Sequence, residues 1–349
     1  MMFETELARD ESRWLIVSDN PEQLSFTAGG GATKQWLYNV AIELASYPNP
    51  RFRVLVWHEN DTTEAKYVHV VAQAAGQKCE ITSHHQQVSI QSTGAVSAIG
   101  RCIAKAQLFG SLEADSSGNG TVPVGGYHRI SSQLVGAGQT IGAVHEFSVE
   151  GEGGVLTIGT VWSNQAQDYT ATAMATAQSN MHCRGSWPWC GVRATLLERP
   201  IEQPIGNIPI ILAEASIGMF NDAIGKETEL FVFRSTADDP NQAGYEGNLG
   251  LYGVDLDLSY KVRNVGQSPI DIYSSLAAWN SGATPVVVGA IQIGSQNWGF
   301  GPVRYLDEEE LRLGEWNLLP NGVAEITHKI VIAGPTSLPA GLRVTFTPD

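Results

Sequence analysis

Four cysteines are the first residues whose chemistry has to be considered: Cys79, Cys102, Cys183 and Cys190. None lies in a C-x-x-C pair, the spacing typical of zinc sites, so the sequence gives little support for bound zinc. Cys183 and Cys190 flank the stretch RGSWPW, where a disulfide would close a short loop in an oxidising compartment. Whether this pair, or Cys79 with Cys102, is bonded stays open, because buried reduced thiols explain all four equally well.

Histidines offer two candidate groupings. The adjacent pair His84–His85 would point to opposite faces of a strand and could not easily share one metal ion. His58 and His69 could meet across a hairpin and bind a metal with Glu59 or Asp61. Ordinary solvated polar faces are the favoured interpretation of both groupings, and we predict no metal site and no cofactor.

Carboxylates form three candidate groupings, each with a simpler explanation. DSSGNG from Asp115 resembles the start of a calcium loop, but position twelve is Gly126 instead of the required Glu, so a turn is favoured. The acidic run Asp307–Glu310 could hold a cation weakly or stabilise a helix N-terminus. Asp255 and Asp257 would lie on one strand face at a spacing that glycosidase acids also use, although solvated strand faces often carry acids.

Tryptophans are the most promising contact residues in the chain. Trp187 and Trp189 bracket a proline in the cysteine-flanked loop, and Trp298 lies in the glycine-rich stretch GSQNWGFGP. Exposed rings could stack on sugars or anchor a neighbouring subunit, whereas packing inside the core is the alternative. There is no G-x-S-x-G elbow, no P-loop and no H-E-x-x-H, so we predict no catalytic residues and no enzyme.

Composition limits the function classes. The 349 residues are 43% hydrophobic, enough for a substantial core, and 16% charged. The net charge of −15 argues against direct binding of nucleic acid, which needs clustered Lys and Arg. No apolar run of about 18 residues is present to cross a membrane. The acidic N-terminal stretch lacks the long apolar segment of a secretory signal, so either the protein is not exported by that route or the sequence is already processed.

The stretch Gly250–Asn264, GLYGVDLDLSYKVRN, sets the fold class. Its apolar and polar residues alternate with a period of two, which predicts a strand with one buried face. Leu37–Ala45 alternates similarly, and further short strands follow between Gly, Pro and Asn turns. These features predict an all-β protein of antiparallel sandwiches, either jelly rolls or immunoglobulin-like. Residues 94–113 have the spacing of one short helix.

Two sequence matches predict an internal duplication. LYNV at Leu37 matches LYGV at Leu251, and the segment from Val122 matches the segment from Leu318. The predicted organisation is an N-terminal arm over residues 1–12, a first sandwich over 13–163, a Trp/Cys and Pro-rich connector over 164–209, and a second sandwich over 210–349. Chance similarity between β-rich segments is the alternative.

Several of these motifs, in the same order, resemble a family of bacterial two-part β-sandwich proteins of uncharacterised function, of the cyanobacterial and Gram-positive surface-protein type. The motifs are SDNPE at Ser18, RVLVWHENDT at Arg53, PVGG at Pro123, EGEGGVLTIGTVW at Glu150 and GLYGVDLDLSYKVRN at Gly250. The resemblance implies the fold and a non-enzymatic character, and it supplies no activity to carry over.

The function predicted from the sequence is therefore structural. We expect a self-associating subunit, a homo-oligomer or polymer, of a surface layer, fibre or shell, at the cell surface, outside the cell or in a virion. A viral capsid protein with two jelly rolls in one chain is the first alternative, because length and duplication suit it. A carbohydrate-binding module that uses Trp187, Trp189 or Trp298 is the second alternative. Strand order separates jelly rolls, with eight strands in two four-stranded sheets, from other sandwiches.

Overall fold

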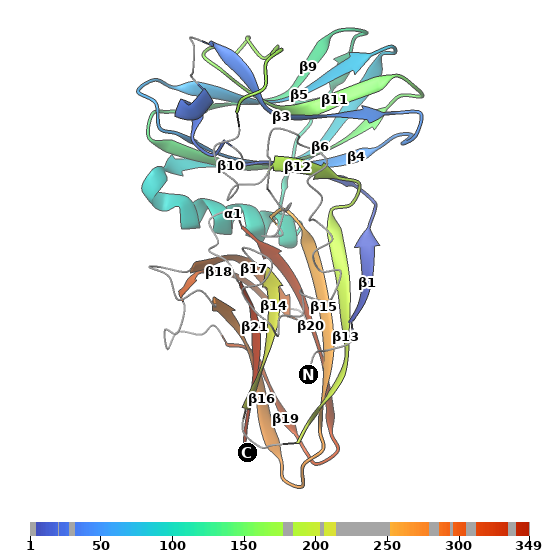
Figure 1. The fold of residues 1–349 in the computed structure, drawn as a ribbon, viewed down its shortest axis with the longest axis vertical. Helices are drawn as coiled ribbons and strands as arrows, with labels where there is room; N and C mark the ends of the chain where they lie inside the picture. Colours follow the sequence, from blue (N-terminus) through green and yellow to red (C-terminus); the bar gives the residue numbers. More distant parts are fainter. Residues whose placement is uncertain are drawn as a thin grey trace. The chain divides into compact units, whose positions relative to one another are not determined.

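The chain is nearly all β in the computed structural model (Figure 1). The structure describes residues 5–19, 21–27, 32–176, 184–202, 206–213, 252–278, 286–293, 296–304, 312–333 and 340–348. They form two compact units. The N-terminal unit comprises the described residues from 11 to 190, and the C-terminal unit comprises Thr5–Asp10 together with the described residues from 191 onward. No helix in the described part of the chain is both long and apolar enough to cross a bilayer.

The N-terminal unit consists of two sheets. The first has the order β12-β2-β4-β10-β6-β7, with β8 also paired to β6, and the second has the order β3-β11-β5-β9. The strands of the first sheet are β2 (Trp14–Ser18), β4 (Arg51–Asn60), β6 (Cys79–Ser92), β7 (Glu113–Ala114), β8 (Gly120–Val122), β10 (Gln139–Glu150) and β12 (Arg184–Trp187). Those of the second are β3 (Lys34–Glu43), β5 (Lys66–Ala75), β9 (Tyr127–Val135) and β11 (Val155–Ser163).

The core of the N-terminal unit lies between these sheets. Alternate residues of each strand point inward, so that Val56 of β4 and Phe147 of β10 belong to the same buried cluster as Val70 of β5 and Ile158 of β11. The predicted helix is confirmed as α1 (Val96–Leu108), which lies against β6 and β10. Two short 3-10 helices, η1 (Leu24–Thr27) and η2 (Thr93–Ala95), complete the unit.

The C-terminal unit also consists of two sheets. One has the order β1-β13-β15-β20-β17-β18 and the other has the order β14-β21-β16-β19. The strands of the first are β1 (Thr5–Asp10), β13 (Gly191–Ile201), β15 (Asp255–Asn264), β17 (Val286–Ile293), β18 (Gln296–Arg304) and β20 (Val323–Ile332). Those of the second are β14 (Gly206–Ala213), β16 (Ile270–Ala278), β19 (Arg312–Leu318) and β21 (Ala340–Pro348).

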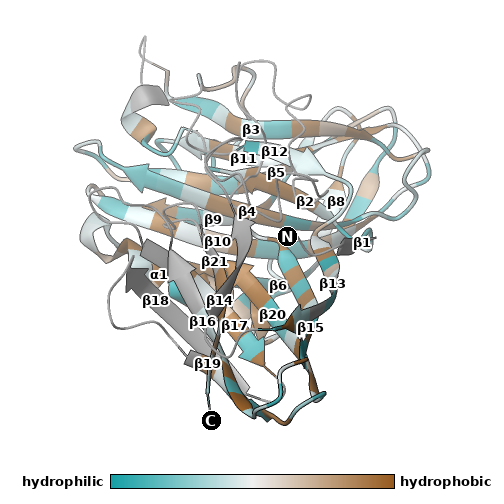
Figure 2. Cartoon of the chain, turned by 60° about the horizontal axis from the view of Figure 1, so that its bottom comes forward, coloured by the Kyte–Doolittle hydropathy of each residue, from teal (hydrophilic) through white to brown (hydrophobic). Residues whose placement is uncertain are grey.

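The strand predicted from the alternation in Gly250–Asn264 is β15. Leu256, Leu258, Tyr260 and Val262 are buried, with exposed fractions of 3% or less, while the residues between them are partly or fully exposed. The alternation can be followed in the hydropathy colours of Figure 2. The prediction of an all-β sandwich protein is therefore confirmed.

Strand pairing follows the same scheme in both units. In the N-terminal unit β3 pairs with β11, β4 with β10, β5 with β9 and β6 with β7. In the C-terminal unit β14 pairs with β21, β15 with β20, β16 with β19 and β17 with β18. All eight pairs are antiparallel, so the eight strands named in each unit form one long hairpin rolled into two facing sheets, to which the remaining strands are added.

This scheme changes which segments are counterparts. The sequence matches paired the Leu37 stretch with the LYGV stretch, and the Val122 segment with the Leu318 segment. By position in the sheets, however, the counterpart of β3 is β14 and that of β15 is β4, while β9 corresponds to β19 and β10 to β20. The two matches therefore join strands that do not occupy equivalent positions, because alternating β strands resemble one another wherever they lie.

One strand in each unit departs from the predicted antiparallel arrangement. β2 runs parallel to β4, and β13 runs parallel to β15. Parallel neighbours need a crossover between them. Here the crossover contains a strand of the facing sheet, β3 in one unit and β14 in the other.

The predicted arm and connector form parts of sheets. Thr5–Asp10, within the predicted arm, is strand β1 and pairs with β13 from Thr5↔Leu196 to Asp10↔Gly191. Within the predicted connector 164–209, β12 extends the first sheet of the N-terminal unit, and β13 and β14 belong to the C-terminal unit. The boundary between the units falls between Cys190 and Gly191.

Close backbone packing explains one glycine of the N-terminal unit. Gly159 lies in β11, opposite Asn39 of β3, just before a register shift. A Cβ atom at this position would lie 2.0 Å from the carbonyl oxygen of Tyr38. Only glycine fits, because the contact would be with backbone that cannot rotate away.

We expect Gly159→Ala to lower the free energy of unfolding by about 1–3 kcal/mol, since the strands must separate to admit the methyl group. Gly94→Ala is the matched control, because nothing lies within 4 Å of its added Cβ. Urea unfolding followed by circular dichroism measures both. Equal stability of the two variants would contradict the assigned packing.

Candidate functional site

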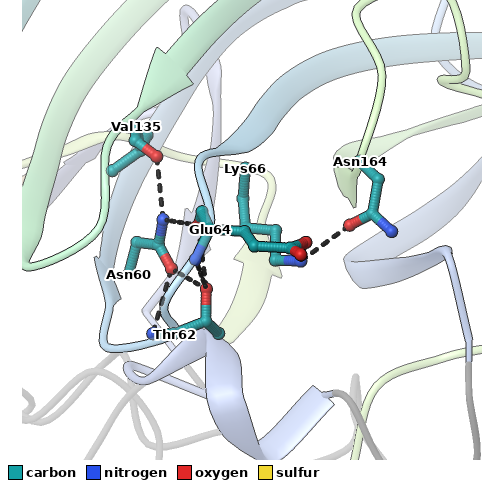
Figure 3. A network of polar contacts seen from close by, with 6 residues as sticks. All are labelled: Asn60, Thr62, Glu64, Lys66, Val135 and Asn164. Atoms are coloured by element: carbon teal, nitrogen blue, oxygen red, sulfur yellow. Dashed lines mark hydrogen bonds and ion pairs between the residues drawn. The ribbon is translucent and has the colours of Figure 1, made fainter.

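Four hydrogen bonds converge on the side chain of Asn60, the last residue of β4 (Figure 3). Its Nδ2 donates to the carbonyl oxygens of Glu64 and Val135, each at 2.8 Å. Its Oδ1 accepts from the Thr62 amide at 3.2 Å and from the Thr62 hydroxyl at 2.6 Å. Asn60 is fully buried, so it joins the loop after β4 to the end of β9 without contacting solvent.

A lysine lies beside this loop. The Nζ of Lys66 donates to Oδ1 of Asn164 at 2.7 Å and is 3.7 Å from Oε2 of Glu64. It also lies 5.5 Å from the centroid of the Trp162 ring, and the residue is only 8% exposed. The amine thus has an amide oxygen, a carboxylate and an aromatic face as neighbours. This arrangement ties the start of β5 to the end of β11.

The C-terminal unit has the same corner around Asn264, the last residue of β15. Its Nδ2 donates to the carbonyl oxygens of Ser268 at 2.8 Å and Leu318 at 3.0 Å, and its Oδ1 accepts from the amide of Gly266 at 2.9 Å. The acceptors stand at the same places relative to the asparagine as in the N-terminal unit. The position of Lys66 is taken by Ile270, the first residue of β16. The asparagine corner is therefore present in both units, whereas the lysine contact is present only at the corner of the N-terminal unit.

A histidine also recurs at equivalent positions. His145 of β10 lies opposite Val54 of β4, and His328 of β20 lies opposite Leu258 of β15. The Nε2 of His145 is 3.3 Å from the Ser131 hydroxyl. The Nε2 of His328 is 3.1 Å from the Tyr260 hydroxyl and 3.3 Å from the Ser274 hydroxyl. Burial lowers the pKa of His145 to about 4 and that of His328 to about 3.

A buried serine and histidine in the N-terminal unit have the geometry of a nucleophile and its base. The hydroxyl of Ser18 is 2.9 Å from Nε2 of His58 and 2.5 Å from the hydroxyl of Thr160. However, the third partner, at Nδ1 of His58, is the carbonyl oxygen of Pro21 at 2.8 Å. A serine nucleophile must be reachable by its substrate, but Ser18, His58 and Thr160 are all 0% exposed. The three groups link β2, β4 and β11 across the core.

The favoured interpretation of His58 and His69 as residues of solvated faces is wrong, because both are 0% exposed. The alternative, a contact across a hairpin, is also absent, because β4 and β5 lie in different sheets. The Nε2 of His69 is 2.9 Å from the Ser163 hydroxyl, and its ring lies near Tyr67 and Tyr169. Among the described residues no group of three or more His, Cys, Asp or Glu side chains could hold a metal ion.

A buried ion pair joins β4 and β10. Arg53 is 2% exposed, and its Nε donates to Oε1 of Glu146 at 2.8 Å. Arg13 donates to the same oxygen at 2.5 Å. Burial raises the pKa of Glu146, but the two guanidinium groups outweigh this and hold it below its ordinary value. The carboxylate therefore stays charged, which suits a structural link better than a proton-transfer role.

The three predicted contact tryptophans have different local surroundings. Trp187 ends β12 and is 1% exposed, so its ring is packed inside and offers no stacking face, because the RGSW stretch adds to β2 as a strand. Trp189 is half-buried. Trp298 pairs with Ile291 across β17 and β18, and its side chain lies outside the part that the structure describes.

The remaining candidates have ordinary surroundings. Asp115 accepts hydrogen bonds from the Ser117 amide and the Ser83 hydroxyl, as the predicted turn requires. Asp257 lies 3.8 Å from Arg193 on a partly exposed strand face. Cys79 and Cys102 are not joined by a disulfide. Cys183 and the Asp307–Glu310 run lie outside the described residues.

The two asparagines and the two core histidines were missed from the sequence. Asparagine after a strand normally indicates a turn and says nothing of a buried side chain. The available signal was that both alternating stretches, RVLVWHEN and DLDLSYKVRN, end on asparagine.

No family model and no curated protein matches the chain. Among solved structures, it is similar to the CUB1-EGF-CUB2 domains of rat MASP-1, with 8% identity and a TM-score of 0.16 over 88% of this chain and 97% of that chain. It is similar to the human MASP-1/3 domains, with 8% identity and a TM-score of 0.18 over 89% and 99%. It is also similar to the CupB6 tip adhesin from Pseudomonas aeruginosa, with 10% identity and a TM-score of 0.18 over 99% and 94%. Likenesses with such low TM-scores carry no argument, so the fold rests on the chain's own strands.

We expect Asn60→Ala and Asn264→Ala each to lower the free energy of unfolding by about 1–3 kcal/mol, because each leaves one buried carbonyl oxygen, that of Val135 or of Leu318, without this donor. Asn317→Ala is the matched control, since Asn317 is exposed and its Nδ2 contacts only the Asp271 carboxylate at 2.9 Å. Urea unfolding measures all three. Equal, small losses would contradict the bridging role of the buried side chains.

Stability should fall as the pH drops from about 6.5 toward about 4. Because the folded pKa values of His145 and His328 lie below the ordinary value, the unfolded chain takes up protons in this window and the folded chain does not. Replacing both residues with Gln should flatten the decline in unfolding free energy with falling pH. His85→Gln is the control, since its side chain is 49% exposed. An unchanged pH profile in the double variant would rule out this linkage.

Proposed function

We propose that the protein is a non-enzymatic structural subunit whose copies assemble into a shell, and that each unit is a jelly roll. The observation that carries the proposal is strand order. The eight strands of the long hairpin are β3–β7 with β9–β11 in the N-terminal unit, and β14–β21 in the C-terminal unit. When they are numbered from 1 to 8 along the chain, one sheet of each unit has the order 1-8-3-6 and the other contains the order 2-7-4-5. A jelly roll has eight strands in two facing sheets, and viral capsid proteins are one class built from it.

An internal duplication is part of this proposal. The strand order, the parallel neighbours β2 and β13, the corner asparagines and the interlayer histidines all recur at equivalent positions. Four independent features of this kind are hard to explain by chance pairing of unrelated sandwiches. Among shell proteins, a capsid protein with two jelly rolls in one chain is the subclass that these features favour.

The environments of the polar groups support contact over catalysis. In the described residues considered above, the paired Ser18 and His58 are buried, Glu146 is held as a carboxylate by two arginines, and Nζ of Lys66 donates to Oδ1 of Asn164. The net charge of −15 implies that copies repel one another through their surfaces at low salt. Assembly must therefore rely on apolar contacts or on screening by ions.

A carbohydrate-binding module remains the second candidate, and Trp189 is the observation in its favour. Its ring is half-buried, unlike that of Trp187, so part of it is accessible to a sugar. Binding to a glycan array that disappears in Trp189→Ala would favour this candidate over the shell subunit. The resemblance to two-part surface proteins agrees with either function and stays a prediction.

Purified protein should form particles much larger than one chain, visible in negative-stain images and by light scattering after size-exclusion chromatography. Because screening weakens repulsion between acidic copies, assembly should begin at a lower protein concentration at about 0.5 M salt than at about 0.05 M salt. A protein that stays monomeric at every concentration and salt level would contradict the proposed function.

A further inference from the structure

The C-terminal unit has an exposed apolar tip, defined here as Val265, Leu319 and Val323. Their exposed fractions are 42%, 64% and 43%, and they are half of the six large hydrophobic residues found exposed among the described residues. Two connections build the tip, the loop from β15 to β16 and the turn from β19 to β20 (Figure 1).

Backbone contacts place the three residues at the same end of the unit. The amide of Asn321, in the turn after Leu319, donates to the carbonyl oxygen of Asn264, which precedes Val265. Val323 pairs directly with Arg263. The buried Asn264 side chain holds the corner from inside, so the apolar side chains project from a fixed frame.

The equivalent corner of the N-terminal unit lacks this character. There the positions of Val265, Leu319 and Val323 are taken by Asp61, Gly136 and Thr140, on the same backbone frame around Asn60. The Asp61 carboxylate accepts hydrogen bonds from the amide and hydroxyl of Ser25 in η1, at 2.8 and 2.5 Å. The same frame thus carries polar or small residues in one unit and apolar residues in the other. Folding alone does not require the apolar set.

Charge indicates what covers the tip. Neither 264–270 nor 317–323 contains an Asp, Glu, Lys or Arg, although the chain as a whole carries −15. Of the flanking charges, Lys261 pairs with Glu325 at 3.2 Å and Arg263 with Glu198 at 3.0 Å. Asp271 accepts a hydrogen bond from Asn317, and the exposed Glu202 follows Ile201, whose carbonyl oxygen accepts from the Val265 amide. Two acidic copies that repel elsewhere therefore meet less opposition at the tip, where carboxylates lie only around the apolar side chains.

We propose that the apolar tip is a contact between copies of the chain, formed by the same tip of a second copy in a symmetric arrangement. A symmetric contact needs a self-complementary surface, and an uncharged apolar patch satisfies this. Three side chains cover much less than the roughly 1,200 Å² of a stable interface, so one contact is weak. It becomes effective when a subunit makes several contacts at once, which an assembling shell supplies. The inference rests on the proposed function in this respect.

The corner of the N-terminal unit indicates which substitutions test the tip contact. Val265→Asp, Leu319→Gly and Val323→Thr together give the tip the residues that the N-terminal unit carries on the same frame. Val124→Asp is the matched control, because Val124 is 61% exposed in the other unit. Light scattering and negative-stain images then compare assembly, and circular dichroism confirms folding. If the triple variant does not fold, Leu319→Asp alone takes its place.

We expect the tip variant to need about tenfold more protein to assemble, or to stay monomeric, while the control behaves as the unaltered chain. In addition, Leu319→Cys should give an oxidised dimer on a non-reducing gel, whereas Val124→Cys should not. Assembly that is equal in the tip variant and the unaltered chain would overturn the tip contact and leave the proposed function intact.

Two further outcomes overturn the inference differently. An unaltered chain that stays monomeric removes the proposed function and the tip contact with it. A monomer that floats with phosphatidylcholine vesicles, and loses this binding in the tip variant, would show that the tip meets a lipid surface instead of a second copy.

Discussion

A sandwich can be closed at its corners only if the backbone groups that turn away from the sheets still find hydrogen-bond partners. In both units a single carboxamide satisfies this need. Asn60 and Asn264 each donate to one carbonyl oxygen in the loop that follows and to one at the end of a strand of the facing sheet, and each accepts a hydrogen bond from that loop. Aspartate has no such donors, and a hydrophobic residue has neither donors nor acceptors. The corner position, and with it the register between the facing sheets, depends on this one residue type.

The polar groups inside the sandwiches follow the same constraint. Ser18, His58 and Thr160 satisfy one another across the core, as do His328, Tyr260 and Ser274. Such groups cost free energy when buried and recover it only if every partner is in place. These hydrogen bonds strongly favour one packing arrangement of the two sheets over alternative arrangements, whereas the aliphatic side chains between them could pack in several ways. Resemblance to a catalytic pair is therefore weak support for catalysis when the pair lies inside a sheet interface.

The sequence indicated the fold class because period-two alternation is visible without any partner strand, as in β15. It did not indicate β14, since the prolines of residues 199–209 suggested a boundary. Pro209 is tolerated because β14 is the edge strand of its sheet, and Pro200 lies beyond the part of β13 that β1 covers. Counterpart strands were mispaired because alternation carries no information on which sheet a strand joins. Trp187 looked like an exposed loop residue because only the partner strand β2 makes its segment a strand. The asparagine corners need long-range acceptors, which no local pattern shows.

The position of β1 has a consequence for biosynthesis. Residues Thr5–Asp10 leave the ribosome before the whole N-terminal unit, yet they pair with β13, which emerges after it. The N-terminal unit can therefore complete its sheets during translation, while the earliest strand waits as an unpaired edge. An unpaired strand is a template for pairing with another chain. During synthesis on crowded polysomes, this segment is where nascent chains are most exposed to entanglement, and a chaperone that shields strand edges would act there.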